Sequence, residues 1–275
     1  MSAPPGNTGT IQVMTEPGYP SFHLTDKVVI LTGASSGLGR RFAGVLHGAG
    51  AKLVVSARRI DRLDQLIADL DDGGPDSRII PVACDVTDPD SADILVTTAV
   101  EQFGAVDVIV NNAGISRVMP AVDDNRDDFV GEITINLVAP YELARTAAGW
   151  MIERNRPGSI INIGSVMGFG GGGRLRAAGY AASKGGLHNL TRELASQWAR
   201  KGIRVNALAP GWFASEMTND MFGTESGRSY IKANTPMGRP GHEHELDGPL
   251  LFLASDVSSY VTGHVLAVDG GWTAI

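Results

Sequence analysis

The chain has 275 residues, of which 43% are hydrophobic and 19% are charged, and its formal net charge is −7. This length allows a large buried core in one or two domains. The mild acidity argues against a nucleic-acid-binding protein, which favours a basic surface, and a single cysteine, Cys84, excludes an internal disulfide framework.

The first 24 residues are rich in proline, glycine and threonine and precede the regular part of the sequence. They lack the charged stretch and apolar run of a signal peptide. Nowhere does the chain reach the roughly 18 consecutive apolar residues of a membrane-spanning helix. We therefore expect a soluble, cytoplasmic protein without a membrane partner, in which residues 1–24 form an arm or tail outside the main fold.

From residue 27 onwards, short apolar segments alternate with longer segments of helical periodicity. The predicted strands cover residues 27–33, 52–57, 78–85, 106–114, 158–165, 203–211 and 264–270. The predicted helices cover residues 38–50, 61–72, 88–104, a segment ending near Asn155, 180–201 and 243–254. Such alternation is typical of βαβ units with a parallel sheet covered on both faces.

The predicted fold class is accordingly α/β. Residues 25–275 are expected to form a single doubly wound, Rossmann-type domain with a seven-stranded parallel sheet. The segment 212–240 interrupts the alternation with prolines, glycines and scattered aromatic residues. A long loop of this kind inside a compact domain is usually functional, so we expect a lid over the substrate there.

A glycine-rich segment, "TGASSGLG" at 32–39, stands where the first predicted strand meets the first predicted helix. Gly33, Gly37 and Gly39 permit a tight turn and close approach of a pyrophosphate to backbone N–H groups, and the helix N-terminus favours negative charge. This context favours a dinucleotide site. The alternative is a glycine-rich turn without a ligand.

Two further motifs follow in order: "NNAG" at 111–114 and "GYAASKGG" at 179–186, which holds Tyr180 and Lys184 four positions apart. With the G-x-x-x-G-x-G spacing at 33–39, they resemble the short-chain dehydrogenase/reductase family over nearly all of residues 25–275. The resemblance implies an NAD(P)-dependent oxidoreductase that assembles as a homotetramer or a homodimer. It also implies the cofactor-binding residues Gly33, Ser35, Ser36, Gly37, Leu38, Gly39, Arg58, Arg59, Asp85, Val86, Asn112, Ala113, Gly114, Tyr180, Lys184, Pro210, Gly211, Phe213 and Ser215.

The end of the second predicted strand bears on which cofactor binds. Ala57 stands where NAD-binding family members carry an aspartate for the ribose hydroxyl, and Arg58 and Arg59 follow it. Arginine binds phosphate in a bidentate manner, so NADP(H) is favoured and NAD(H) stays open. The alternative is that both arginines are solvated residues at a helix start. Asp85 has two interpretations that can coexist, a contact with the adenine or a cap-like aspartate in "CDVTD".

The resemblance assigns the chemistry to Asn136, Ser165, Tyr180 and Lys184. A free tyrosine has a pKa of about 10, and a nearby cation lowers it. Tyr180 is the implied general acid/base, with Lys184 lowering its pKa and binding the nicotinamide ribose. Ser165 is implied to bind the substrate oxygen, and Asn136 to hold a proton-relay water. No zinc-ligand pattern accompanies them, so no metal is expected.

Ser165 and Tyr180 are 15 positions apart, slightly more than is common in the family, and four consecutive glycines lie between them. This region and the lid supply six large apolar side chains. An apolar pocket wall would favour ketones or secondary alcohols with hydrophobic flanks as substrates. The alternative is that several of these side chains pack the lid onto the core. The residues predicted for this wall are Met167, Phe169, Trp212, Met217, Met221 and Phe222.

The predicted function is thus the interconversion of a carbonyl compound and a secondary alcohol by an NADP(H)-dependent oxidoreductase. Two alternatives lie in the same class, a 3-oxoacyl-thioester reductase and an NAD-dependent alcohol dehydrogenase. From another class, a dinucleotide-sensing protein without catalysis is also open, although such relatives typically lose the tyrosine or the lysine.

Overall fold

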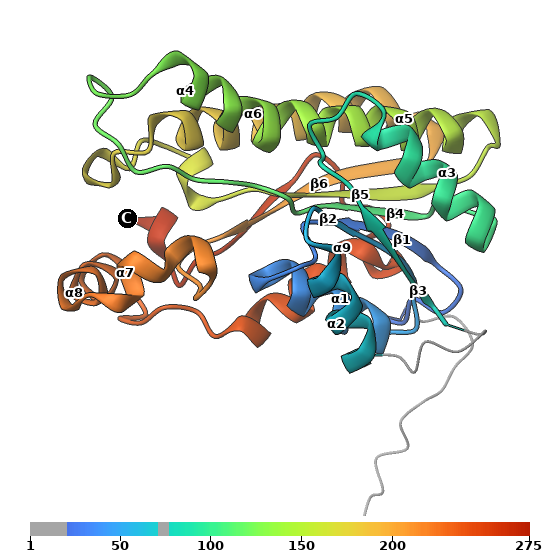
Figure 1. Cartoon of the computed structure of the whole chain (residues 1–275), viewed down its shortest axis with the longest axis horizontal. Helices are drawn as coiled ribbons and strands as arrows, with labels where there is room; N and C mark the ends of the chain where they lie inside the picture. Colours follow the sequence, from blue (N-terminus) through green and yellow to red (C-terminus); the bar gives the residue numbers. More distant parts are fainter. Residues whose placement is uncertain (1–20, 71–76) are drawn as a thin grey trace, which may run out of the picture.

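The computed structural model describes residues 21–70 and 77–275. Within them, seven strands form one parallel sheet in the order β3–β2–β1–β4–β5–β6–β7 (Figure 1). This confirms the predicted doubly wound α/β fold. The strands are β1 Val28–Thr32, β2 Lys52–Ala57, β3 Ile79–Ala83, β4 Val108–Asn111, β5 Gly158–Ile163, β6 Ile203–Pro210 and β7 Val265–Val268.

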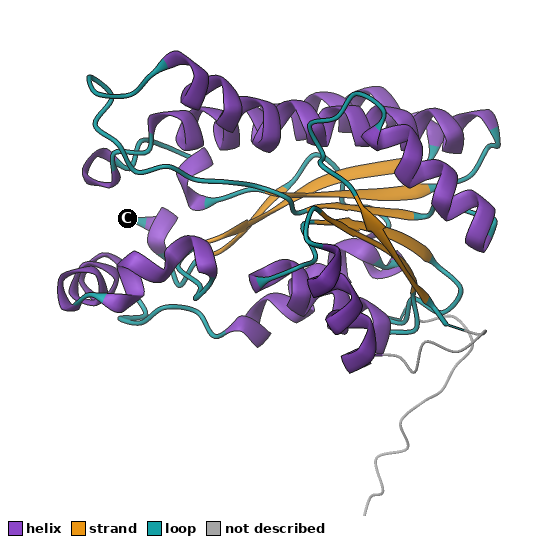
Figure 2. Cartoon of the chain, viewed as in Figure 1, coloured by secondary structure: helices purple, strands orange, loops and turns teal. Residues whose placement is uncertain are grey.

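Helices cover both faces of the sheet, as Figure 2 shows. Helices α1, α2 and α9 pack on one face, and α3, α5 and α6 pack on the other. The helices are α1 Gly37–Gly48, α2 Ile60–Leu70, α3 Ser91–Phe103, α4 Arg126–Ile133, α5 Ala139–Glu153, α6 Ala178–Trp198, α7 Asn219–Gly223, α8 Glu225–Asn234 and α9 Asp247–Ala254.

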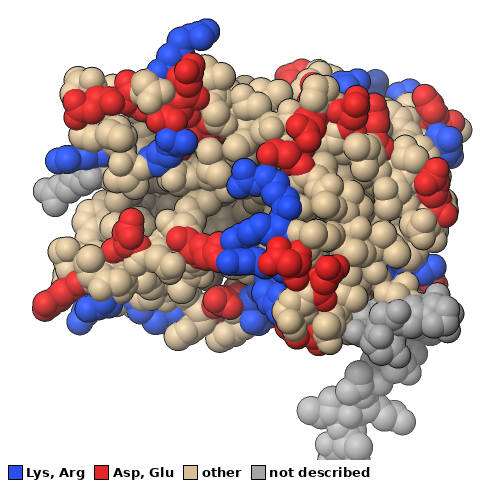
Figure 3. Space-filling model, in the orientation of Figure 1, with Lys and Arg blue, Asp and Glu red and all other residues tan. Residues whose placement is uncertain are grey.

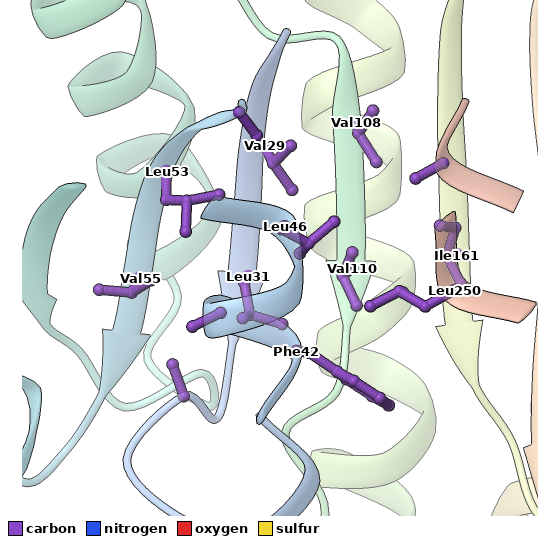
Figure 4. Close-up of a cluster of buried hydrophobic side chains, with 14 of the residues drawn as sticks. Val29, Leu31, Phe42, Leu46, Leu53, Val55, Val108, Val110, Ile161 and Leu250 are labelled. Carbon is purple, nitrogen blue, oxygen red and sulfur yellow. The ribbon is translucent and has the colours of Figure 1, made fainter. Parts of the chain in front are cut away.

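Strand β1 lies inside the sheet, between β2 and β4, and contributes to both layers. Val29 and Leu31 face α1, where Phe42 and Leu46 are fully buried against them (Figure 4). The intervening residues of β1 point to the opposite layer. A strand buried on both faces reads as a continuous apolar run, which explains why "VVILT" was recognisable in the sequence.

Two predicted segments differ from the structure. The helix predicted to end near Asn155 consists of α4 and α5, joined by a π-helical turn at Thr134–Val138. The 212–240 segment, expected as a long loop, contains the short helices α7 and α8. Thr224 separates these two helices and caps α8 by accepting a hydrogen bond from the Gly227 N–H, at 3.1 Å.

The N-terminal arm predicted for residues 1–24 lies outside the described residues up to residue 20. Leu24 itself is fully buried in the core, and its N–H donates to the carbonyl of Ala49 at 2.8 Å. In the described part of the chain, none of the helices is both long enough and apolar enough to cross a bilayer.

The order of the strands determines where a site can form. Strands β1 and β4 are neighbours in the sheet but are separated in sequence by β2 and β3. The chain winds away from this point in both directions, and doubly wound sheets bind ligands beside such a switch point, at the carboxyl ends of the strands.

Candidate active site

A cavity of about 580 Å³ lies along the carboxyl edge of the sheet. Residues at or just beyond the ends of β1, β2, β3, β4, β5 and β6 line it. Figure 3 shows a hollow in the surface, with basic and acidic side chains together at its edge. All the residues that the sequence assigned to a cofactor line this cavity, from Gly33 to Ser215. Because it runs past the ends of six strands, the cavity suits an extended ligand such as a dinucleotide.

The glycine-rich turn forms one end of the cavity. Gly33 and Gly37 have φ values of +69° and +50°, which favour glycine, and a Cβ on Gly39 would lie 2.1 Å from the Gly33 carbonyl oxygen. The Asn112 amide donates to the carbonyls of Thr32 and Gly33 at 3.0 and 3.1 Å, which fixes the turn against the end of β4. Ser36 makes no side-chain cap at the start of α1. The first N–H groups of α1 therefore stay available to an anion.

Substituting Gly39 with alanine tests the tight packing of this turn. The added methyl group would overlap backbone, so the turn must shift, and we expect a loss of about 1–3 kcal/mol in unfolding free energy together with weaker dinucleotide binding. Gly44→Ala in the same helix is the control, because its Cβ would meet only the Leu70 side chain at 3.5 Å. Urea denaturation and cofactor titration measure both effects. Equal behaviour of the two variants would contradict this description of the turn.

Arg59 and Arg58 differ in how they reach the cavity. The Arg59 Nη2 lies 3.2 Å from the Ser35 Oγ, 3.1 Å from the Ser36 Oγ and 3.2 Å from the Glu216 Oε2. The Arg58 side chain is 71% exposed, and its Nη1 lies 3.8 Å from Asp85. Arg59 is therefore held beside the phosphate turn, whereas Arg58 extends into solvent.

Asp85 follows β3 and lines the cavity, with its carboxylate turned to the local backbone. Its Oδ1 accepts hydrogen bonds from the Thr87 N–H at 3.0 Å and from the Thr87 hydroxyl at 2.8 Å. The Thr87 N–H is the largest cause of a lowered Asp85 pKa. This is the cap-like arrangement that the sequence suggested as one of two interpretations; the adenine contact stays a prediction.

Tyr180, Lys184 and Ser165 line the other end of the cavity. Tyr180 and Lys184 lie one turn apart in α6, and the Lys184 Nζ is 5.6 Å from the centre of the Tyr180 ring. Lys184 is 4% exposed, and its ammonium donates to the Ile163 carbonyl at 2.7 Å. Burial lowers the pKa of Lys184 to about 8.

The Tyr180 phenol differs electrostatically from the sequence-based expectation. Burial raises its pKa above the ordinary value, and a hydrogen bond with Ser165 opposes this only in part. The net direction is thus opposite to the lowering by Lys184 that the sequence predicted: burial outweighs it, and the Lys184 ammonium donates to the Ile163 carbonyl. Tyr180 is therefore a protonated phenol at neutral pH here.

Asn136 lies in the π-helical turn between α4 and α5 and is fully buried. Its Oδ1 accepts the Ile115 N–H at 2.9 Å, and its Nδ2 donates to the Ile115 carbonyl at 2.8 Å and to the Ser183 Oγ at 3.0 Å. It thereby ties α6 to the segment after "NNAG". Single π-helical turns often occur at functional sites, but no periodicity in the sequence indicates this one. The proton-relay role of Asn136 stays a prediction.

Comparisons with known proteins show which family has this sequence and fold. A family model described as enoyl-(acyl carrier protein) reductase matches residues 33–273. A 2-dehydro-3-deoxy-D-gluconate 5-dehydrogenase from Dickeya dadantii is 36% identical, over 92% of this chain and 98% of that protein. A 3-oxoacyl-(acyl-carrier-protein) reductase from Thermotoga maritima is 36% identical, over 90% and 98%. The chain belongs to the short-chain dehydrogenase/reductase family.

The fold of this short-chain dehydrogenase/reductase also matches solved structures. The gluconate 5-dehydrogenase from Burkholderia cenocepacia, in complex with NADP and tartrate, superposes with a TM-score of 0.86. It is 34% identical and covers 92% of this chain and 98% of the other. The chain is thus an NAD(P)-dependent oxidoreductase of this family.

The residues predicted for an apolar pocket wall lie mostly outside this cavity, and their contact with a substrate stays a prediction. Of its six residues, Met217 lines the cavity, and Met167, Phe169, Trp212, Met221 and Phe222 do not. The Phe169 ring packs on His188, with ring centres 4.8 Å apart. The Trp212 ring packs edge-on against Trp272 and lines a separate cavity of about 100 Å³. In this structure the Phe169 ring thus packs on α6, and the Trp212 ring packs on the C-terminal Trp272.

Polar residues that sequence reasoning missed also line the site. Ser116 follows "NNAG", and Glu216 and Thr218 belong to the lid segment "PGWFASEMT". Their adjacency to recognised motifs was the signal that could have found them. Within residues 21–70 and 77–275, no group of three or more His, Cys, Asp and Glu side chains is arranged to hold a metal ion.

His188 lies one turn beyond Lys184 in α6, packed against Gly164 and Gly168, and is 1% exposed. Burial is the largest cause that lowers its pKa from 6.5 to about 4. A neutral imidazole in the folded state contributes stability above the unfolded pKa of 6.5, and this contribution is lost as the pH falls towards 4.

We therefore expect acid to destabilise the protein partly through His188. Between pH 7 and pH 5, wild type should lose about 2 kcal/mol more unfolding free energy than His188→Gln, which cannot be protonated. Urea denaturation of both proteins at the two pH values measures this difference. An identical pH dependence in the two proteins would show that His188 does not titrate on unfolding in this range.

Proposed function

We propose that the protein is an NADP(H)-dependent oxidoreductase that interconverts a ketone and a secondary alcohol of a polar, polyhydroxylated substrate. One observation carries the proposal. A single cavity joins the glycine-rich turn and Arg59 at one end to Tyr180, Lys184 and Ser165 at the other. A dinucleotide bound along this cavity would have its phosphates near the glycine-rich turn and Arg59, and its nicotinamide ring near Tyr180, Lys184 and Ser165.

The chain's own residues suggest how the cofactor would be held. The N–H groups at the start of α1 suit the pyrophosphate, and Arg59, with the Ser35 and Ser36 hydroxyls beside it, suits a 2′-phosphate. Pro210, the last residue of β6, and Phe213, which follows that strand, line the cavity where the nicotinamide is expected. When bound, the nicotinamide supplies or accepts a hydride.

The proposed proton transfer belongs to Tyr180. As a protonated phenol next to Ser165, it can give its proton to the oxygen of a carbonyl that is being reduced, while the Ser165 hydroxyl donates a hydrogen bond to the same oxygen. In the reverse direction Tyr180 accepts the alcohol proton. Lys184, with a pKa of about 8, is mostly charged at neutral pH and stabilises the resulting phenolate. Asn136 is proposed as a positioning residue that holds α6 against the segment after β4.

Two findings support a polar substrate. The compared relatives include a dehydrogenase of a deoxygluconate and a gluconate 5-dehydrogenase solved with tartrate. The Ser116 and Ser165 hydroxyls line the cavity, and of the predicted apolar wall Met217 alone is part of its lining. We therefore propose a sugar acid or a polyol as the substrate class, in place of the apolar ketone expected from sequence.

A 3-oxoacyl-thioester reductase is the second candidate, and the 36% identity to the Thermotoga maritima reductase supports it. A panel of sugar acids, polyols and a 3-oxoacyl thioester, each assayed with NADP(H) and NAD(H), separates the two candidates. We expect the highest kcat/KM with a sugar acid or polyol and NADP(H). Turnover of the thioester alone would favour the second candidate.

The proposal also covers the domain organisation, the location and the assembly of the chain. We propose residues 25–275 as the catalytic domain, with residues 212–240 as its lid, and residues 1–24 as an arm whose last residue, Leu24, packs in the core. The proposed assembly is a cytoplasmic homotetramer or homodimer. Exposed apolar side chains gather on α4, the π-helical turn and α5, and they support an interface there. They are Phe129, Val130, Val138 and Tyr141. Mass photometry at assay concentration measures the subunit number.

A further inference from the structure

Glu216 begins a short 3-10 turn, Glu216–Thr218, at the start of the lid. The preceding residue, Ser215, lies directly over the phosphate turn: a Cβ on Gly37 would be 3.3 Å from the Ser215 Cβ. The Thr218 hydroxyl accepts the Ser215 N–H at 2.9 Å and donates to the Phe213 carbonyl at 2.7 Å. These contacts fix the Glu216 backbone beside the cofactor cavity, which Glu216 lines.

The Glu216 carboxylate reaches across the cavity to two arginines of the β2–α2 region. Its Oε2 accepts from the Arg59 Nη2 at 3.2 Å, and its Oε1 accepts from the Arg62 Nη1 at 2.5 Å. Hydrogen bonds from Arg62 and then Arg59 lower the pKa of Glu216, so it is ionised at neutral pH. Arg62 was not part of the sequence-based site.

The same Arg59 nitrogen faces the Ser35 and Ser36 hydroxyls. These three donors converge where a phosphate on the adenosine ribose is proposed to bind, and Glu216 places a carboxylate among them. A carboxylate and a phosphate are alternative partners for one guanidinium group, and two like charges at this distance repel each other.

We propose that Glu216 determines cofactor specificity by competing with the 2′-phosphate of NADP(H) for Arg59. This inference rests on the proposed NADP(H)-dependent function. Binding of NADP(H) displaces the carboxylate from Arg59, while Arg62 remains as its partner and retains the lid on α2. NAD(H), which has a hydroxyl at that position, leaves the Glu216–Arg59 contact in place. Glu216 therefore weakens NADP(H) binding selectively.

The test is isothermal titration of NADPH and NADH into wild type and Glu216→Gln, without substrate. Solvent-exposed ion pairs are weak, so we expect NADPH to bind about two- to fivefold more tightly to the variant, with the NADH affinity unchanged. The gain should shrink at high salt, because exposed charges are screened. In an Arg59→Met background, the gain from Glu216→Gln should be smaller, because the competition for Arg59 is gone and only the repulsion between the carboxylate and the phosphate is removed.

Asp220→Asn is the matched control, since Asp220 is an exposed lid carboxylate in α7. An equal gain in this control would assign the effect to net charge and overturn the proposal. Unchanged NADPH binding in Glu216→Gln would also overturn the proposal. Weaker NADPH binding would overturn it as well, by showing that Glu216 orients the arginines for the cofactor. The proposed function fails separately, if wild type binds neither cofactor or turns over no substrate in the panel.

Discussion

Tyr180→Phe is expected to lower kcat by about 10²- to 10⁴-fold, the usual contribution of a positioned general acid or base. The substitution removes one oxygen, and with it the proton that the substrate oxygen would receive. The ring stays in the helix one turn from Lys184, so the NADPH dissociation constant should change by less than about twofold. Steady-state kinetics and a fluorescence titration of NADPH measure the two quantities.

Tyr260→Phe provides the control, because Tyr260 is fully exposed and far from the catalytic helix in sequence. We expect native kinetics from it. Near-native turnover by Tyr180→Phe would exclude Tyr180 as the proton donor. Loss of NADPH binding together with turnover would instead indicate that the hydroxyl supports the cavity itself.

Arg59→Met is expected to raise the NADPH dissociation constant by about 10- to 100-fold and to leave that of NADH nearly unchanged. A hydrogen-bonded charge pair of this kind contributes about 1.5–3 kcal/mol, and methionine keeps an unbranched apolar stem like that of arginine without the guanidinium group. Titration of each variant with NADPH and NADH measures the change in preference.

Arg58→Met separates the two arginines that the sequence could not distinguish. Because Arg58 is mostly exposed and lies 3.8 Å from Asp85, its loss should cost NADPH binding only about twofold, as for a solvent-exposed ion pair. A larger effect at Arg58 than at Arg59 would mean that the 2′-phosphate binds on the solvent side of β2. Equal loss of NADPH and NADH affinity in Arg59→Met would remove Arg59 as a specificity residue.

Sequence reasoning predicted the sheet well because its inner strands are buried on both faces. Val28–Thr32 is an apolar run that leads into the glycine-rich turn. This short segment was therefore enough to predict both the strand and the position of the ligand at its carboxyl end. The four residues of the predicted catalytic set were chosen from their motifs. Tyr180, Lys184 and Ser165 line one end of the cavity, and Asn136 lies behind it, bonded to Ile115.

The sequence does not predict the contacts between distant parts of the chain. Trp212 and Phe169 are apolar residues near the motifs. The Trp212 ring packs on Trp272 and the Phe169 ring on His188, and the periodicity of the sequence does not indicate which partner a ring contacts. The contact between Glu216 and Arg59 joins residues 157 positions apart. The Tyr180 pKa depends on burial by the folded chain, so a one-turn spacing from Lys184 was not enough to predict its direction.

The most direct test of the proposed chemistry is a single-turnover experiment. Wild-type protein saturated with NADPH is mixed with an excess of a keto sugar acid, and the loss of NADPH absorbance is followed by stopped flow. We expect one NADPH oxidised per active site in a fast phase that Tyr180→Phe abolishes. Tight NADPH binding without oxidation by any carbonyl compound of the panel would contradict the proposed chemistry and favour a dinucleotide-sensing protein.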